Sequence, residues 1–188
     1  HRGGLKAGEY CAIIGAGPIG LLAGMIAQAY GAHAILLDLV QERLDFAKEL
    51  GIEYVINSGE EDAAARVSEI TGGMMAQQVM ECSGSNAAIR SSLDLVSNAG
   101  RITLTGWPPR ETSIPTDIIT RKEIDIRGAR TSAGEFEEAI ELIYTKKVDV
   151  AKILTKTISL DEAPETIRDI EKNPGNYMKV VVKVDKTV

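Results

Sequence analysis

The sequence predicts an α/β fold: a doubly wound, six-stranded parallel sheet covered by helices, followed by a smaller α+β segment. Up to residue 132, short apolar runs of strand length alternate with segments of helical period. Parallel neighbouring strands need crossover connections, and most consecutive runs here are separated by such a helical segment. After residue 132 the pattern changes, so we expect one domain at 1–132 and a separate C-terminal segment at 133–188.

The first half of the sheet is predicted from apolar runs that stop at glycine or at a polar residue. The run YCAIIG at 10–15 is apolar throughout, as in a strand buried on both faces. A helix follows at 18–30, with a proline in its first turn and Gly31 after its last. The next elements are a strand at 34–38, a helix at 40–50, a strand at 54–56 and a helix at 60–71.

The second half repeats the same unit and then departs from it. Strands are expected at 78–82, 101–105 and 124–129, with a helix at 86–96. The C-terminal segment reads as a helix at 133–146, an extended stretch at 153–158, a helix at 161–171 and a strand at 178–184.

Composition narrows the function classes. The chain has 188 residues, 44% of them hydrophobic, which is enough for a globular core. Its net charge of −6 argues against binding to nucleic acid or to an anionic membrane surface. No membrane span or signal peptide is visible, and a cytoplasmic protein is expected. The first residues contain no starting methionine, and we expect a fragment of something longer.

Cysteine and histidine are too few for a metal centre. The chain has Cys11, Cys82, His1 and His33 only, at spacings that no zinc site uses. Both cysteines fall in or at the end of apolar runs, so buried free thiols are expected rather than a disulfide. We therefore expect neither metal ligands nor catalytic residues within this chain.

The hexad Gly15-Ala16-Gly17-Pro18-Ile19-Gly20 is the strongest candidate binding motif. It follows a predicted strand, opens a predicted helix, and precedes by 18 residues Asp38, which ends the next strand. This context indicates a dinucleotide site of the Rossmann fold: Gly15 allows the tight turn, Gly17 lets the pyrophosphate approach, and Gly20 allows close helix packing. A simple turn and a methyltransferase-type nucleotide loop are the alternatives.

Asp38 favours NAD over NADP. Its carboxylate can accept from the ribose hydroxyls of NAD, whereas a 2′-phosphate would meet a like charge. Arg43, five residues later, is a candidate for contact with the same ribose, although a solvated surface arginine is an alternative.

Several stretches in order carry a family resemblance: GAGPIGLL, LLDLVQERLDFAKELG, ECSGS, AGRITLTG and RKEIDIRGA. Together they resemble the medium-chain, zinc-type alcohol dehydrogenases, in the branch of sorbitol and other polyol dehydrogenases with threonine dehydrogenase near. The resemblance covers essentially the whole chain. It implies that residues 133–188 complete a catalytic domain whose zinc-binding remainder lies N-terminal to this chain.

The resemblance also implies a set of NAD-binding residues. They form the pyrophosphate loop, the adenosine-ribose contacts, and the segments after strands four, five and six: Gly15, Gly17, Pro18, Ile19 and Gly20; Asp38 and Arg43; Cys82, Ser83 and Gly84; Thr105, Gly106 and Trp107; Arg130, Thr131 and Ser132. The run Arg130-Thr131-Ser132 and the run at 155–158 depart from the polyol enzymes, which leaves the alcohol substrate undefined.

The expected function is the cofactor-binding part of a zinc-dependent NAD(H) alcohol or polyol dehydrogenase, which transfers hydride between a secondary alcohol and NAD. This chain alone is expected to bind NAD without turnover. An NAD-binding regulatory or sensor module without catalysis is the alternative. A homodimer is expected through the edge strand at 124–129, from Ile124 to Ala129, because unpaired sheet edges seek partners.

Overall fold

The computed structural model describes residues 1–184, which form two compact units: His1–Val148 and a second unit that begins at Asp149. Helix α6 (Phe136–Tyr144) falls within the first unit. We expected a division after residue 132 because residues 133–188 were expected to complete another domain. That assignment stays a prediction. No helix among residues 1–184 is long and apolar enough to cross a membrane.

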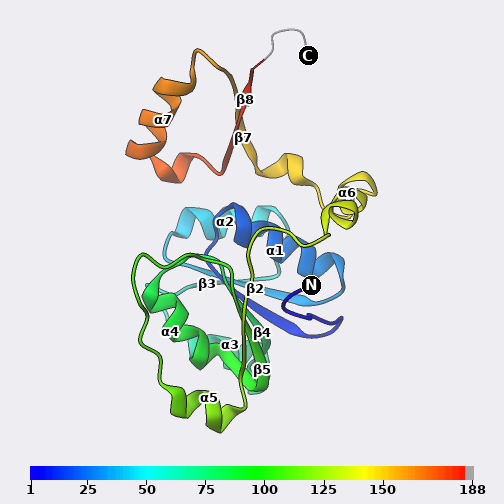
Figure 1. Ribbon diagram of the computed structural model, residues 1–188, viewed down its shortest axis with the longest axis vertical. Coiled ribbons are helices and arrows are strands. Elements are labelled where there is room, and N and C mark those ends of the chain that lie inside the picture. Colours follow the sequence, from blue (N-terminus) through cyan, green and yellow to red (C-terminus); the bar gives the residue numbers. More distant parts are fainter. Residues whose placement is uncertain (185–188) are drawn as a thin grey trace. The chain divides into compact units, whose positions relative to one another are not determined.

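The first unit contains the expected six-stranded parallel sheet, in the order β3-β2-β1-β4-β5-β6 (Figure 1). The predicted fold class is confirmed. The strands are β1 (Tyr10–Ile14), β2 (His33–Asp38), β3 (Tyr54–Asn57), β4 (Ala76–Glu81), β5 (Val96–Leu104) and β6 (Asp125–Gly128). The helices between them are α1 (Pro18–Ala29), α2 (Gln41–Glu49), α3 (Ala63–Ile70), α4 (Asn86–Leu95) and α5 (Thr116–Lys122).

Helices cover both faces of this sheet, because successive side chains of each strand point to opposite faces. Ala12 and Ile14 of β1 pack in one buried cluster with residues of α3 and α4. Ile13, which points the other way, contacts the region of Gly24 in α1. Figure 1 shows the result, with α1 and α2 on one side of the strands and α3 and α4 on the other.

The register brings the carboxyl ends of the strands to one edge of the sheet. Ile14 of β1 stands opposite Leu37 of β2 and Glu81 of β4. Glu81 stands opposite Leu104 of β5, which in turn stands opposite Gly128 of β6. In sheets of this topology ligands bind at this edge, next to the point where the strand order reverses, which is between β1 and β4 here.

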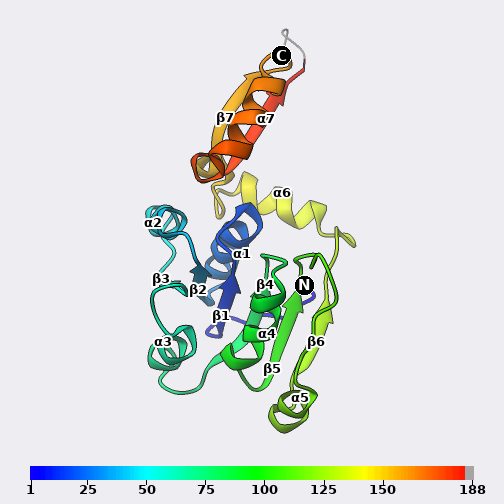
Figure 2. The same cartoon turned by 90° about the vertical axis from the view of Figure 1, so that its left-hand side faces the viewer.

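Three local features differ most from the sequence-based expectation, and the first is that β5 begins at Val96, five residues before the expected strand at 101–105. Helix α5 was not expected, because its segment follows three prolines and has only two isoleucines to show a period. Those isoleucines, Ile118 and Ile119, pack against the buried cluster. Strand β6 is shorter than expected, running from Asp125 to Gly128, and Figure 2 shows it at the end of the sheet beside β5.

The second unit is a small βαβ arrangement. Strands β7 (Leu154–Ser159) and β8 (Lys179–Lys183) pair in parallel, and α7 (Ala163–Lys172) connects them. Short 3₁₀ turns precede each strand, η1 (Val150–Ile153) and η2 (Pro174–Asn176). The expected order of helix, strand, helix and strand after residue 133 is present, with α6 as its first member. An isolated two-stranded sheet has little core, and Leu154, Val181 and Val182 are partly exposed.

Candidate functional site

The loop between β1 and α1 makes the close approach that its glycines predict. Gly15 has a φ of +106°, in the region that favours glycine. A β-carbon on Gly20 would lie 1.7 Å from the carbonyl oxygen of Gly15, so no larger residue fits there without moving the backbone. The first turn of α1 therefore lies directly against the end of β1.

Gly17 borders open space at the start of α1. It is the N-cap residue, no side chain caps the helix, and a β-carbon on Gly17 would meet no atom within 4 Å. The first amide groups of a helix have no intrahelical acceptor, and Pro18 at the helix start has no N–H group to leave unpaired. An uncapped helix N-terminus beside open space fits an anionic group such as a pyrophosphate.

Asp38 ends β2 with its carboxylate against the glycine loop. Oδ2 accepts from the N–H of Ala16 at 2.6 Å, and Oδ1 accepts from the N–H groups of Leu39 and Val40 at 2.8 and 3.0 Å. The side chain is 10% exposed, and a guanidinium nitrogen of Arg43 lies 4.0 Å from Oδ2. Because a carboxylate offers about four lone-pair sites, it can still accept from a ligand hydroxyl.

The turn after β4 is organised by the side chain of Glu81. Its Oε1 accepts three hydrogen bonds: from the N–H of Ser83 at 2.8 Å, from the hydroxyl of Ser83 at 2.5 Å and from the N–H of Gly84 at 2.9 Å. This turn also touches the glycine loop, since a β-carbon on Gly15 would lie 3.2 Å from the β-carbon of Ser83.

The turn after β5 is bound to the same residue through its main chain. The carbonyl oxygen of Glu81 accepts from the N–H groups of Thr105 and Gly106 at 2.9 and 3.0 Å, and from the hydroxyl of Thr105 at 2.7 Å. That hydroxyl also lies 3.3 Å from the sulfur of Cys82. Burial raises the pKa of the Cys82 thiol to about 11, so the thiol is protonated at neutral pH.

The segment after β6 meets the turn after β5 at Trp107. The guanidinium of Arg130 lies over the indole ring of Trp107, 4.8 Å from the ring centroid. The indole itself is 75% exposed. Thr131 has a φ of +59°, and the hydroxyl of Ser132 donates to a carboxylate oxygen of Glu135 at 3.0 Å.

The sequence-predicted residues thus form a row along one edge of the sheet. The glycine loop is bonded to Asp38 on one side and touches the turn at 82–84 on the other. That turn packs against Trp107, since a β-carbon on Gly84 would lie 2.8 Å from the carbonyl oxygen of Trp107. Arg130 closes the row over the indole. Within the glycine loop, Ile19 is exposed, with 58% of its surface accessible.

Comparison with known proteins identifies the family. The family described as zinc-binding dehydrogenase matches residues 18–145, which include every residue of the row except Gly15 and Gly17. The chain belongs to the zinc-binding dehydrogenase family. The family resemblance found in the sequence is confirmed.

Three relatives show how the match is distributed. An uncharacterized zinc-type alcohol dehydrogenase-like protein of Haemophilus influenzae is 51% identical over 96% of this chain and 53% of its own length. A sorbitol dehydrogenase of Gallus gallus is 31% identical over 99% of this chain and 53% of its own length. A solved structure from E. coli CFT073, described as a short chain alcohol dehydrogenase complexed with the cofactor NADH, aligns with a TM-score of 0.88 and 25% identity over 97% of this chain and 54% of that one. The chain therefore spans about half the length of the relatives that it matches.

Zinc has no ligand set in the described part of this zinc-binding dehydrogenase chain. Among residues 1–184, no three His, Cys, Asp or Glu side chains come together so as to hold a metal ion. Both cysteines are free, and burial raises the pKa of the Cys11 thiol far above its usual range. Residues 1–184 thus do not fit a zinc site.

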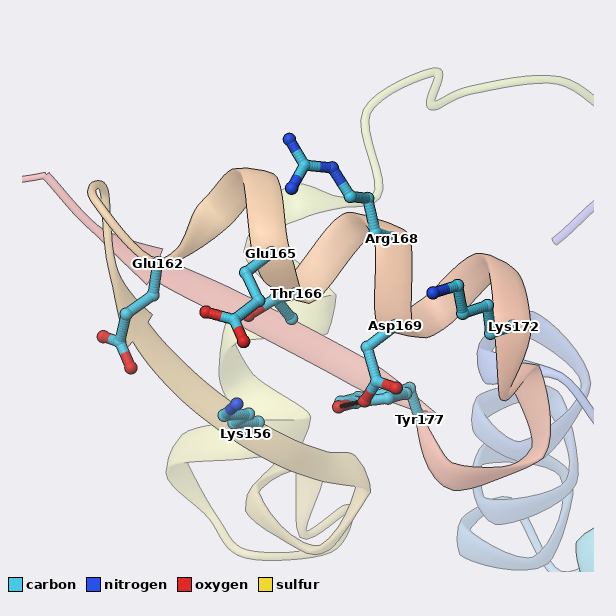
Figure 3. A pocket seen from close by; sticks show the side chains of 8 residues that line it. All are labelled: Lys156, Glu162, Glu165, Thr166, Arg168, Asp169, Lys172 and Tyr177. Atoms are coloured by element: carbon cyan, nitrogen blue, oxygen red, sulfur yellow. Dashed lines mark hydrogen bonds between the residues drawn. The ribbon is translucent and has the colours of Figure 1, made fainter.

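The second unit contains a shallow hollow beside α7 (Figure 3), lined by Lys156, Glu162, Glu165, Thr166, Arg168, Asp169, Lys172 and Tyr177. Its three acidic and three basic side chains balance in charge. Figure 3 shows Tyr177 and Asp169 pointing toward each other, and the tyrosine hydroxyl donates to the carboxylate. This bond, with a second from Asn173, lowers the pKa of Asp169. With its charges balanced, the lining shows no preference for a ligand of either sign.

Two residues with a structural part in the row were not recognised in the sequence. Glu81 was not predicted as a site residue, although an acidic residue inside a buried apolar run is a signal in itself. Asn86 at the start of α4 donates to the carbonyl of Arg110 at 3.0 Å and to the hydroxyl of Thr112 at 2.5 Å. It thereby fixes the long loop after β5. No pattern in the neighbouring sequence predicts this contact.

Proposed function

We propose that this chain is the cofactor-binding part of a zinc-dependent NAD(H) alcohol or polyol dehydrogenase. The observation that carries the proposal is the start of α1, where glycines bring an uncapped helix N-terminus beside open space and Asp38 is bonded to the same loop. A nicotinamide dinucleotide supplies the ring that accepts or donates the hydride, and the relative from E. coli CFT073 is complexed with NADH.

Each segment of the row has a distinct part in this proposal. The glycine loop, with Pro18 and Ile19, holds the pyrophosphate, and Asp38 with Arg43 contacts the adenosine ribose. The turn at 82–84 forms the floor beneath that ribose. The segments at 105–107 and 130–132 border the nicotinamide and orient it toward the substrate carbon.

The alcohol-activating group lies outside residues 1–184 in this proposal. Zinc in a dehydrogenase acts as a Lewis acid on the alcohol oxygen, and the described residues offer it no ligand set. The second unit supports the same view, because Leu154, Val181 and Val182 are partly exposed on the faces of its two-stranded sheet, as in a sheet that packs against further chain. The substrate of the whole protein is a secondary alcohol or polyol.

The proposed assembly is a homodimer through β6. This strand is at the edge of the sheet, and Ile126 is 36% exposed there. A second copy related by a two-fold axis would pair edge to edge and extend the sheet through both subunits.

The experiment that tests cofactor binding compares two glycine variants. Trp107 is the only tryptophan, so energy transfer from its indole to NADH reports binding directly. In Gly17→Ala the new methyl group meets no protein atom, so the fold is kept, but it occupies the space assigned to the pyrophosphate. We expect NADH binding to weaken at least about tenfold, with the melting temperature nearly unchanged.

Gly175→Ala is the matched control, since it also has open space and lies in the second unit. It should bind NADH as the unmodified chain does. Absence of NADH binding by the unmodified chain, or unaltered binding by Gly17→Ala, would overturn the proposal.

A further inference from the structure

Glu81 has an unusual position for a charged residue. It ends β4 in the interior of the first unit and is 0% exposed. One of its oxygens, Oε2, has no hydrogen-bond partner among residues 1–184. Burying a carboxyl group with an unpartnered oxygen is costly, and an apolar side chain would fill the same space without that cost.

The other polar atoms of Glu81 explain what the residue does there. Oε1 accepts all three hydrogen bonds from the turn at 83–84, and the main-chain carbonyl accepts three from Thr105 and Gly106. One residue therefore holds the turn after β4 with its side chain and the turn after β5 with its main chain.

Close packing makes this arrangement sensitive to small displacements. A β-carbon on Gly106 would lie 2.5 Å from Oε2 of Glu81 and 2.2 Å from the amide nitrogen of Gly84. The two turns thus contact each other through glycine backbone, and the carboxyl group of Glu81 lies against both of them. Movement of one turn by a few tenths of an ångström would displace the other.

We propose that Glu81 is a positioning residue of the dinucleotide site. It fixes the position of the turn at 82–84 relative to the turn at 105–107. It contacts no cofactor atom itself and acts through Ser83, Gly84 and Gly106. The inference rests on the proposed function, because these turns are the ribose and nicotinamide segments of that proposal. It explains why a buried carboxyl group is kept where stability alone would favour an apolar residue.

The test uses two variants of Glu81 with different chemistry. Glu81→Leu removes the carboxylate oxygen that accepts three hydrogen bonds from the turn after β4, and we expect NADH to bind at least about tenfold more weakly. Glu81→Gln keeps an acceptor oxygen at the position of Oε1, so we expect its affinity to lie within about threefold of the unmodified chain. Affinity is measured by energy transfer from Trp107, well below the melting temperature of each variant. Emission of unliganded Trp107 reports displacement of its turn, and we expect it to change in Glu81→Leu only.

Gln78→Leu is the matched control for a general loss of stability. Gln78 is also fully buried in β4, and its side chain donates to the hydroxyl of Thr103 in β5 at 2.9 Å. This variant loses a buried bond between the same two strands, so its melting temperature should fall while NADH affinity and Trp107 emission stay unchanged. If Glu81→Leu does not fold, Ser83→Ala removes the hydroxyl bond to Glu81, together with the bond that the same hydroxyl accepts from the N–H of Ser85, and should weaken NADH binding by about threefold.

The outcomes separate this inference from the proposed function. An unmodified chain that binds no NADH overturns the proposed function and the inference with it. If the unmodified chain binds NADH and folded Glu81→Leu binds it with equal affinity, the positioning role alone is overturned. The same holds for Ser83→Ala if that variant replaces Glu81→Leu. Equal weakening in Glu81→Leu and Gln78→Leu would also overturn it, because the effect would then be one of stability.

Discussion

Asp38 has a structural role in the protein without any ligand. Its two oxygens accept three backbone N–H groups, and one of these belongs to the glycine loop. The same carboxylate that is proposed to select NAD therefore also fixes the loop that is proposed to hold the pyrophosphate. Arg43, at 4.0 Å, adds an opposite charge beside it. A substitution at Asp38 should for this reason change both the affinity for the dinucleotide and the choice between its phosphorylated and unphosphorylated forms.

We expect Asp38→Asn to narrow the preference for NADH over NADPH. The amide keeps an acceptor oxygen, but it removes the charge that repels a 2′-phosphate and places a donor near the N–H of Ala16. NADH affinity should fall by about tenfold and NADPH affinity by less. Competitive titration of both cofactors measures the ratio.

Asp45→Asn is the control for net charge, since Asp45 lies on α2 and accepts a bond only from the nearby Gln41 at 2.9 Å. It should leave the cofactor ratio unchanged. A chain that prefers NADPH, or an unchanged ratio in Asp38→Asn, would contradict the assignment.

The geometry that sequence alone could predict is that of residues whose contacts are local. Gly15, Gly20 and Asp38 could be predicted because a strand, a turn and a helix follow one another in the chain, and the spacing itself encodes the geometry. Glu81 could not, because its partners at Thr105 and Gly106 become neighbours only once β4 and β5 pair. Sequence reasoning placed the glycines of the row and missed the residue that joins two of its turns.

At the scale of elements, β1 and β2 could be predicted from local sequence, whereas α5 depends on contacts with distant segments. Strands β1 and β2 are continuous apolar runs bounded by polar or glycine residues, and their positions follow from composition. Helix α5 has seven residues, and its stability comes from packing of Ile118 and Ile119 and from Lys122. The ammonium of Lys122 donates to the carbonyls of Leu93 and Val96 at 2.8 and 2.9 Å. Contacts between distant segments of this kind leave no periodic signal in the sequence.

The proposed dimer interface at the edge strand β6 can be tested by a substitution that keeps its pairing with β5. The N–H of Ala129 donates to Leu104 of β5, and alternate residues of a strand direct their N–H groups to opposite sides, so that of Ile126 faces away from β5. Ile126→Pro should therefore keep the pairing with β5 and block pairing with a second copy. We expect light scattering to give a dimer mass for the unmodified chain and a monomer mass for Ile126→Pro.

Ile140→Ala is the control for loss of an exposed apolar side chain, since Ile140 lies on α6 and is 63% exposed. It should remain dimeric. A monomeric unmodified chain at high concentration would show that the β6 edge does not form the proposed interface.

At the scale of the whole molecule, we expect cofactor binding and substrate activation to be separable. The row from the glycine loop to Arg130 lies within the first unit, whereas no part of residues 1–184 gathers three metal ligands. Relatives of about twice this length have further chain in which such ligands can lie. The chain should therefore show the behaviour of a cofactor domain, which is binding without chemistry.

We expect the chain to form no NADH from NAD and a panel of secondary alcohols and polyols, with or without added zinc. Hydride transfer from an alcohol requires stabilisation of the negative charge that develops on its oxygen, and a metal or preorganised donors must supply it. Neither thiol can substitute, because Cys11 is fully buried and the pKa of Cys82 is raised to about 11. Absorbance at the NADH band measures turnover, and energy transfer from Trp107 in the same sample verifies that the cofactor site is formed. The full-length relative from Haemophilus influenzae, assayed alongside, tests whether the panel contains a usable alcohol. Zinc-dependent NADH formation by this chain would contradict the separation and would require ligands among its own residues.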